Sequence, residues 1–357
     1  MDMHGFTLMR EEDLRETGGR VRLWKHGATG AELLSVCNGD ENKVFGVSFR
    51  TPPKNSTGVA HILEHSVLCG SDKYPVREPF AELLKSSLQT FLNAMTFPDK
   101  TCYPVASCNL QDFYNLIDVY LDAVFHPRID ENVLRQEGWH IEPGDNGENW
   151  QYKGVVYNEM KGVYSSPEAV LQEQCQHAVF PDTLYSLDSG GDPAVIPNLT
   201  YQEFRSFHEL YYHPSNARFY FWGDDPEEAR LARLEKELAG YGPCKVDSGV
   251  PLQARLDAPR KVEAPYAASD GEQENKSHAA LNWLLCETRD TEEMLVLDML
   301  EHIVAGLPGS PLRKALMDSG LGEDIAGCGL ESDLRQAYFS LGLLSIARQD
   351  ADAMERL

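Results

Sequence analysis

The sequence has 357 residues, of which 42% are hydrophobic and 25% charged, fractions that exclude a disordered chain, a collagen and a small disulfide scaffold. At roughly 100–200 residues per domain, this length predicts two domains. The formal net charge of −24 argues against nucleic acid and anionic membrane surfaces as partners. It favours a basic partner, although solubility alone would also explain it.

Targeting and redox signals are weak. The longest apolar stretches, residues 281–286 and 341–347, are much shorter than the roughly 20 residues of a membrane span. The first 20 residues are acidic and lack an apolar core, unlike a signal or transit peptide. None of the eight cysteines forms a CxxC pair. We therefore predict a cytoplasmic protein or, alternatively, one of an organelle matrix after removal of a transit peptide.

Hydrophobic periodicity predicts alternating strands and helices over the first part of the chain. Strands are predicted over residues 33–37, 43–50, 101–109 and 217–222. Helices are predicted over residues 59–69, 78–92, 110–124, 155–163, 167–180 and 201–212. The first of these helices follows a loop whose Ser56 or Thr57 is expected to cap it.

Residues 244–275 are polar and proline-rich, which predicts a linker between a domain over 1–243 and a second one over 276–357. After the linker the pattern restarts. It predicts a strand over 279–286, helices over 291–305 and 311–319, and a strand over 336–347. The second domain is short, so we expect it to be truncated and the chain to be part of a longer protein.

The restart resembles an internal repeat. Residues 61–65 read His-Ile-Leu-Glu-His and residues 298–302 read Asp-Met-Leu-Glu-His, each after a predicted strand and before a small-residue loop and another helix. This shared context predicts a degenerate duplication. Asp298, Glu301 and His302 are interpreted as a relic on a solvated helix face.

The first copy carries a candidate metal site. His61 and His65 lie one helical turn apart, so both imidazoles can reach one zinc ion. Glu64 neighbours both and is left as general base for a metal-activated water. The alternative is an amphipathic helix with two surface histidines. Glu159 is the best third ligand, because an apolar segment makes its carboxylate costly unless it is bound or paired; a half-exposed helix is the alternative.

Several further segments give the sequence a resemblance to the pitrilysin/insulinase family of zinc metallopeptidases, and most of all to the N-terminal part of its presequence-protease (falcilysin-like) branch. The match runs nearly continuously over residues 44–223. The segments are 58–71 (GVAHILEHSVLCGS), 74–80 (YPVREPF), 90–107 (TFLNAMTFPDKTCYPVAS), 136–139 (QEGW), 154–162 (GVVYNEMKG), 189–193 (SGGDP) and 212–219 (YHPSNARF).

By this resemblance, His61, His65 and Glu159 bind one zinc ion per chain and Glu64 is the general base. The resemblance implies an α+β fold of repeated two-layer domains, each a mainly antiparallel sheet packed with helices. Only the first domain would keep the zinc motif, and the C-terminal half of the full-length protein would supply further substrate-binding residues. It also implies that the substrates are unfolded, often basic peptides such as targeting peptides.

The same resemblance puts the peptide against an edge strand at residues 91–96, where strand addition would bind any extended chain. Phe91, Asn93 and Ala94 are the candidate substrate contacts, and the alternative is that Phe91 and Leu92 belong to the core. The sequence thus predicts a zinc endopeptidase. A non-catalytic structural or binding subunit is the alternative, which the intact set of four site residues disfavours. Nothing in the sequence supports a third candidate, a zinc hydrolase of small amides.

Overall fold

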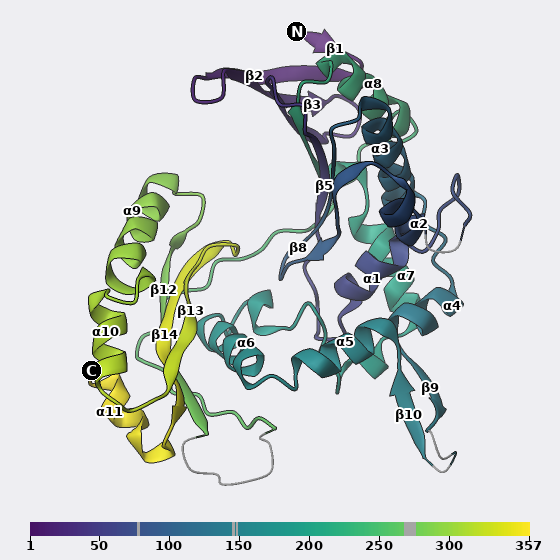
Figure 1. Cartoon of the computed structure of the whole chain (residues 1–357). Coiled ribbons are helices and arrows are strands. Elements are labelled where there is room, and N and C mark those ends of the chain that lie inside the picture. Colours follow the sequence, from purple (N-terminus) through teal and green to yellow (C-terminus); the bar gives the residue numbers. More distant parts are fainter. Residues whose placement is uncertain (77–78, 145–146, 148, 268–275) are drawn as a thin grey trace. The chain divides into compact units, whose positions relative to one another are not determined.

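The computed structural model describes residues 1–76, 79–144, 147, 149–267 and 276–357 (Figure 1). Two compact units divide the chain. Unit 1 comprises Met1–Asn158 and Ser189–Gly249, and unit 2 comprises Glu159–Asp188 and Val250–Leu357. In both, mainly antiparallel sheets pack with helices, which confirms the predicted α+β class.

Unit 1 is built on a nine-stranded sheet with the order β1-β2-β3-β4-β11-β5-β8-β6, to which β7 adds by pairing with β8. Every pair is antiparallel except the parallel pair of β4 and β11. A separate hairpin of β9 and β10 extends away from this sheet (Figure 1). The strands are β1 (Asp2–Met3), β2 (Phe6–Leu14), β3 (Gly19–His26), β4 (Glu32–Cys37), β5 (Lys43–Arg50), β6 (Gln89–Leu92), β7 (Met95–Thr96), β8 (Lys100–Ser107), β9 (His140–Pro143), β10 (Trp150–Lys153) and β11 (Ala217–Gly223).

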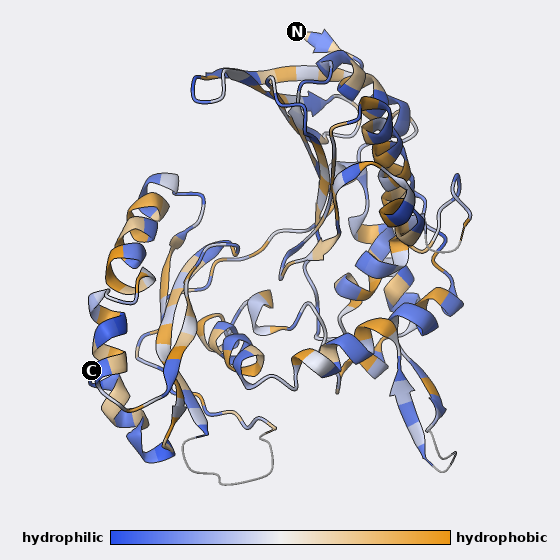
Figure 2. Cartoon of the chain, viewed as in Figure 1, coloured by the Kyte–Doolittle hydropathy of each residue, from blue (hydrophilic) through white to orange (hydrophobic). Residues whose placement is uncertain are grey.

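The core of unit 1 lies between this sheet and its helices. β5 buries alternate residues, among them Phe45, Val47 and Phe49, and helix α3 buries Phe113 and Tyr120. In Figure 2, helix α3 carries both hydrophobic and hydrophilic residues, as expected of a helix with one buried face. The helices are α1 (Val59–Val67), α2 (Pro79–Ser86), α3 (Leu110–Phe125), α4 (Glu131–Val133), α7 (Tyr201–Tyr211) and α8 (Glu227–Leu238), with a π-helical turn over Leu134–Gly138 and 3₁₀ turns over Ile196–Asn198 and Pro214–Asn216.

Helix α1 starts in a way that the sequence did not predict. Its N-cap is Gly58, with a φ of 68°, and the cap makes no side-chain hydrogen bond. Thr57 is no cap, because its hydroxyl donates to Asn55 Oδ1 at 2.6 Å. The backbone of residues 189–192 lies against this start, since a Cβ on Gly191 would lie 2.9 Å from Gly58 Cα. Asp192 N also donates to Ser56 O at 2.9 Å. The loop 189–192 is therefore docked on the start of α1.

Unit 2 contains a three-stranded antiparallel sheet in the order β12-β14-β13. Helix α5 (Val155–Val163) crosses from unit 1 into unit 2, and α6 contacts β12 and β13. A core cluster joins Phe180 and Tyr185 to Val250, Leu334 and Tyr338, which explains why residues 159–188 belong to this unit. The other elements are β12 (Ser277–Glu287), β13 (Asp324–Glu331), β14 (Gln336–Ile346), α6 (Pro167–Val179), α9 (Thr291–Glu301), α10 (Pro311–Asp318) and α11 (Ala351–Glu355), a π-helical turn over His302–Gly306 and 3₁₀ turns over Leu184–Ser186 and Arg348–Asp350.

One predicted helix is partly wrong. Residues 78–92 were predicted as a single helix, but α2 ends at Ser86 and Gln89–Leu92 forms strand β6, paired with β8; Glu78 lies outside the described residues. Apolar spacing fits a helix here, yet the free edge of β8 offers backbone hydrogen bonds that local propensity does not reveal.

The predicted domain ranges remain a prediction. They follow chain order, whereas residues 159–188, which lie inside the first predicted range, belong to compact unit 2. Residues 244–267 of the predicted linker form neither helix nor strand, and 268–275 lie outside the described residues. Within the described part of the chain, no helix is long and apolar enough to cross a membrane.

Candidate metal and catalytic site

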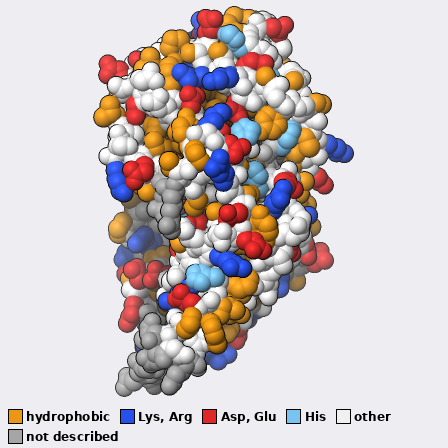
Figure 3. Space-filling model, turned by 90° about the vertical axis from the view of Figure 1, so that its right-hand side faces the viewer, with side chains coloured by type: hydrophobic (Ala, Val, Ile, Leu, Met, Phe, Trp, Pro, Cys, Tyr) orange, Lys and Arg blue, Asp and Glu red, His pale blue; other side chains and the backbone are white. Residues whose placement is uncertain are grey.

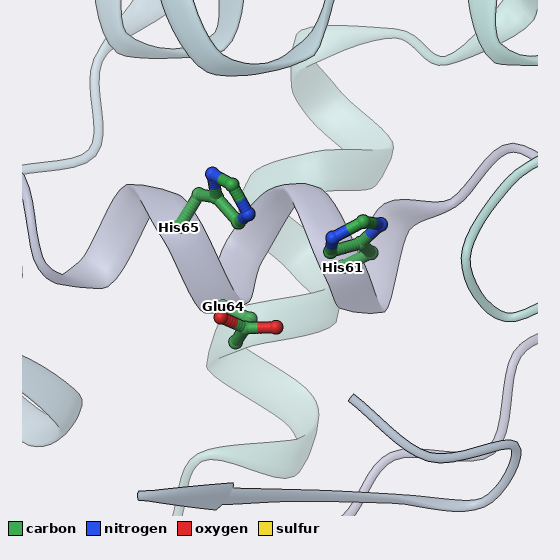
Figure 4. A group of neighbouring side chains, drawn as sticks. All are labelled: His61, Glu64 and His65. Atoms are coloured by element: carbon green, nitrogen blue, oxygen red, sulfur yellow. The ribbon is translucent and has the colours of Figure 1, made fainter. Parts of the chain in front are cut away.

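Helix α1 presents a group of side chains that could hold a metal ion. Its ligand atoms, one each from His61, Glu64 and His65, all lie within 4.8 Å of one another (Figure 4). The two imidazole rings lie edge to face, with centroids 5.0 Å apart and planes inclined at 76°. His61 is 9% exposed and Glu64 8% exposed, so both functional groups are largely shielded from water. Among the described residues, His61, Glu64 and His65 form the group of three or more candidate metal ligands whose ligand atoms lie this close together.

The orientation of His61 is set from the loop docked on α1. Its Nδ1 lies 3.0 Å from the backbone carbonyl oxygen of Gly190. A carbonyl oxygen only accepts, so Nδ1 carries the proton and the lone pair of Nε2 is the one that can bind a metal. This is the arrangement in which a metal-binding histidine is held by a second hydrogen bond.

A buried carboxylate holds His65 in the same way. Glu137, in the π-helical turn that packs against α1, places Oε2 3.4 Å from His65 Nδ1. Its other oxygen accepts from Gln136 Nε2 at 2.9 Å and from Cys69 Sγ at 3.5 Å. Burial raises the pKa of Glu137, but the hydrogen bonds from His65, Gln136 and Cys69 outweigh it, so that the pKa lies below its ordinary value. Glu137 is therefore an ionised partner of His65.

Glu64 accepts a hydrogen bond from strand β7. Thr96 Oγ1 donates to Glu64 Oε2 at 3.0 Å. Burial, followed by the charge of Glu64, raises the pKa of Tyr120 well above its ordinary value, and the neutral phenol donates to Asn93 O at 3.2 Å. The hydroxyl groups of Thr96 and Tyr120 near the candidate base Glu64 are therefore neutral.

Glu159 lies in α5 and belongs to unit 2. It is exposed, so the expectation that burial would make its carboxylate costly is wrong. Its assignment as the third ligand rests on the family resemblance alone and stays a proposal.

The predicted substrate contacts lie on an edge. β6 ends the path of the sheet in unit 1, and Phe91 on it is 47% exposed while Leu92 is buried. Phe91 is therefore not a core residue, and Leu92 is one. Asn93 is exposed and Ala94 half-buried, in the short connection from β6 to β7. The edge ends at Thr96, beside Glu64.

Sequence reasoning gave no role to Glu137, Thr96 or Gly190. All three lie inside segments that carry the family resemblance, 136–139, 90–107 and 189–193. That location was the available signal, because Glu137 and Gly190 lie 72 and 129 residues from their histidine partners and no spacing rule connects them.

Comparison with known proteins identifies the family of the chain. Residues 48–186 match the family described as Insulinase (Peptidase family M16), and residues 198–355 match the Peptidase M16 inactive domain. The chain belongs to the insulinase family of peptidases. It is 52% identical to presequence protease 1, chloroplastic/mitochondrial, of Arabidopsis thaliana, over 99% of this chain and 33% of that protein. With the mitochondrial presequence protease of Xenopus laevis it shares 40% identity, over 99% of this chain and 35% of that protein.

Solved structures share the fold. Crystalline pitrilysin matches with a TM-score of 0.65 at 16% identity, over 98% of this chain and 36% of that one. A peptidase M16 inactive domain from Pseudomonas fluorescens matches with a TM-score of 0.67 at 17% identity, over 94% of this chain and 76% of that one. The chain spans about a third of the length of the curated relatives it matches.

Proposed function

We propose that the chain carries the catalytic centre of a zinc-dependent endopeptidase that degrades unfolded peptides. One observation carries the proposal: His61 and His65 each turn Nδ1 toward an acceptor oxygen while their ligand atoms and that of Glu64 gather within 4.8 Å. Surface histidines on an amphipathic helix have no need of such partners. The family to which the chain belongs supports the same reaction class.

The donor set fits zinc. Two neutral imidazoles and a carboxylate are common ligands of catalytic zinc, which keeps a further position for water. His61 and His65 would hold the ion through Nε2, and Glu159 is the proposed third ligand. When bound, zinc polarises the peptide carbonyl and makes water acidic enough to attack it at neutral pH.

The protein's own residues would do the remaining work. Glu64 accepts the proton of the attacking water at a carboxylate oxygen and later passes it to the leaving amine. Thr96 keeps that carboxylate in place by donating to Oε2. Since Glu64 is largely buried, the proton transfer occurs in a shielded site where charge interactions are stronger than in water.

The edge formed by β6 and β7 is the proposed substrate site. An extended peptide added there would pair through its backbone, which makes binding tolerant of sequence, and exposed Phe91 would contact its side chains. Asn93 and Ala94 lie between β6 and β7, and Thr96 of β7 contacts Glu64. They would therefore contact the peptide near the bond that is cleaved.

The net charge of −24 favours basic peptides, such as targeting peptides. On the face drawn in Figure 3, acidic and basic side chains of the described residues are interspersed, an arrangement that does not resemble a nucleic-acid-binding patch.

The remaining partner is the rest of the protein. Because the chain spans about a third of its relatives' length, we propose that a C-terminal half completes the substrate site. Relatives named as chloroplastic or mitochondrial favour an organelle matrix over the cytoplasm. A non-catalytic binding subunit is the alternative, and the oriented histidines disfavour it.

The test is zinc content and peptide cleavage in the full-length protein. We expect one zinc per chain in the wild type and almost none in the His61→Ala, His65→Ala double variant. His302→Ala, which changes an exposed histidine of unit 2, is the matched control and should keep the metal. Stoichiometric zinc in the double variant would refute the ligand assignment. A wild type that binds zinc but cleaves no unstructured basic peptide would favour the binding subunit.

A further inference from the structure

Two buried or half-buried side chains outside the motif contact the groups that the proposed function uses. Glu137 Oε2 lies 3.4 Å from His65 Nδ1, and Thr96 Oγ1 lies 3.0 Å from Glu64 Oε2. They come from different elements, the π-helical turn over Leu134–Gly138 and strand β7. Each contacts a different functional group of α1.

We propose that these are two positioning residues with separate tasks: Glu137 orients His65 for the metal, and Thr96 orients Glu64 for proton transfer. The inference rests on the proposed function and adds to it which side chains outside the motif determine metal affinity and which determine turnover.

Glu137 is suited to the first task by its own surroundings. It is 6% exposed, and a buried carboxylate is costly unless it is well hydrogen-bonded. Oε1 accepts from Gln136 and from Cys69, which fixes the plane of the carboxylate and directs Oε2 at His65. An acceptor held at Nδ1 selects the tautomer whose Nε2 can bind a metal, and it makes that nitrogen a better donor. Removing it should weaken metal binding.

Thr96 is suited to the second task. A glutamate side chain has three rotatable bonds, so a base needs contacts that restrict it. β7 is anchored to β8 through the pairs of Met95 with Cys102 and Thr96 with Thr101. The hydroxyl therefore approaches Glu64 from a fixed strand. Because it touches the base and not an imidazole, its removal should leave metal affinity almost unchanged and slow the chemical step.

The experiment measures the zinc dissociation constant and kcat in the full-length protein, with circular dichroism to verify folding. Glu137→Ala should raise the zinc dissociation constant about 10–100-fold, measured by competition with a chelator. Glu137→Gln should restore most of the affinity, because an amide oxygen still accepts from Nδ1. Glu131→Ala, which removes an exposed carboxylate of the neighbouring helix α4, is the control and should bind zinc like the wild type.

Thr96→Val should leave the zinc dissociation constant within about threefold and lower kcat by about 10–100-fold at saturating zinc and peptide, as expected for a misplaced catalytic group. Thr96→Ser should recover kcat, since it returns the hydroxyl. Thr7→Val, on the exposed face of β2, is the control for the same chemical change.

The outcomes separate this inference from the proposed function. Unchanged zinc affinity in Glu137→Ala, or an equal loss of affinity in Thr96→Val, would overturn the separate tasks while the wild type still binds zinc and cleaves peptide. A wild type that does neither would overturn the proposed function itself. A kcat of Thr96→Ser as low as that of Thr96→Val would show that the side chain acts by packing rather than through its hydroxyl.

Discussion

Helix α1 in unit 1 contains Leu63-Glu64-His65, and the same three residues, Leu300-Glu301-His302, span the end of helix α9 and the start of the π-helical turn in unit 2. Eight of the nine residues of α1 are buried, whereas none of those of α9 is. Both follow a strand and precede a second helix, β5 and α2 around α1 and β12 and α10 around α9. The two helices thus share the same order of neighbouring elements, but one is buried and the other is not. The sequence motif alone therefore does not define a site.

The two helices differ in the groups that surround their histidines. His61 and His65 face a carbonyl and a buried carboxylate, but His302 is exposed and opens a π-helical turn. Hydrophobic residues cover much of α9 (Figure 2), among them exposed Leu295, Val296 and Met299. Asp298, Glu301 and His302 form no group of candidate ligands among the described residues. In α1, partners distant in sequence turn the shared motif into a candidate metal site.

The largest expected difference between the two helices is in activity. Glu64→Gln should keep zinc and lower kcat/KM about 10²–10⁴-fold, because Gln cannot take a proton. Glu301→Gln, the same change at the matching position of α9, should leave both unchanged. Cleavage of an unstructured basic peptide by the full-length protein is the measurement. A Glu64→Gln protein that cleaves within about threefold of the wild type would exclude Glu64 as the base.

The same comparison can be made for stability. Leu63 is 0% exposed and Leu300 is 49% exposed. Leu63→Ala should lower the free energy of unfolding by about 2–5 kcal/mol, because it leaves a cavity in unit 1. Leu300→Ala should change it by less than about 0.5 kcal/mol. Urea unfolding measures both, and similar losses would mean that α9 is buried in solution.

A half-buried histidine, His208, compared with exposed His302, predicts a pH effect on stability. His208, in α7 beside α1, is half-buried and donates from Nε2 to Val124 O at 2.9 Å. Burial, against smaller opposing effects of Val124 and Glu209, lowers its pKa to about 4. The unfolded chain binds a proton near pH 6.5 and the folded one does not, so stability is lost as pH falls from about 6.5 towards 4.

For a half-buried group this loss amounts to about 1–3 kcal/mol. We expect His208→Gln to reduce the difference between urea midpoints at pH 7 and pH 5, and His302→Gln to leave it unchanged. Equal slopes in wild type and His208→Gln would assign the acid sensitivity to other groups.

The smallest expected effect concerns the loop docked on α1. Gly191 has a φ of 108°, and its Cβ would lie 2.9 Å from Gly58 Cα. Gly191→Ala should therefore cost about 1–3 kcal/mol and weaken zinc binding through His61. Gly240→Ala, where nothing lies within 4 Å of the added Cβ, is the control. Unchanged stability and zinc affinity in Gly191→Ala would show that the loop adapts at no cost.

Much of the site was predictable because it is local. The spacing of His61, Glu64 and His65 is a property of one helix, and the structure brings these residues together as expected. The contributions of Glu137 and Gly190 depend on tertiary contacts between distant segments, which periodicity does not report. Strand β6 was missed for the same reason, since its pairing with β8 decides its conformation. The exposure of Glu159 shows that an apolar neighbourhood in sequence does not establish burial.

The hydrogen bond from His61 to Gly190 also has a consequence for the order of events during synthesis. The two residues are separated by 129 positions. At roughly 5–20 residues per second, Gly190 leaves the ribosome about 6–26 s after His61. During this interval the nascent helix has its two histidines but not the carbonyl that selects the tautomer of His61. We expect ribosome-bound chains in which Gly190 is still inside the ribosome to retain zinc less well than longer chains from which Asp192 has emerged, so that the metal would be acquired late in the synthesis of unit 1.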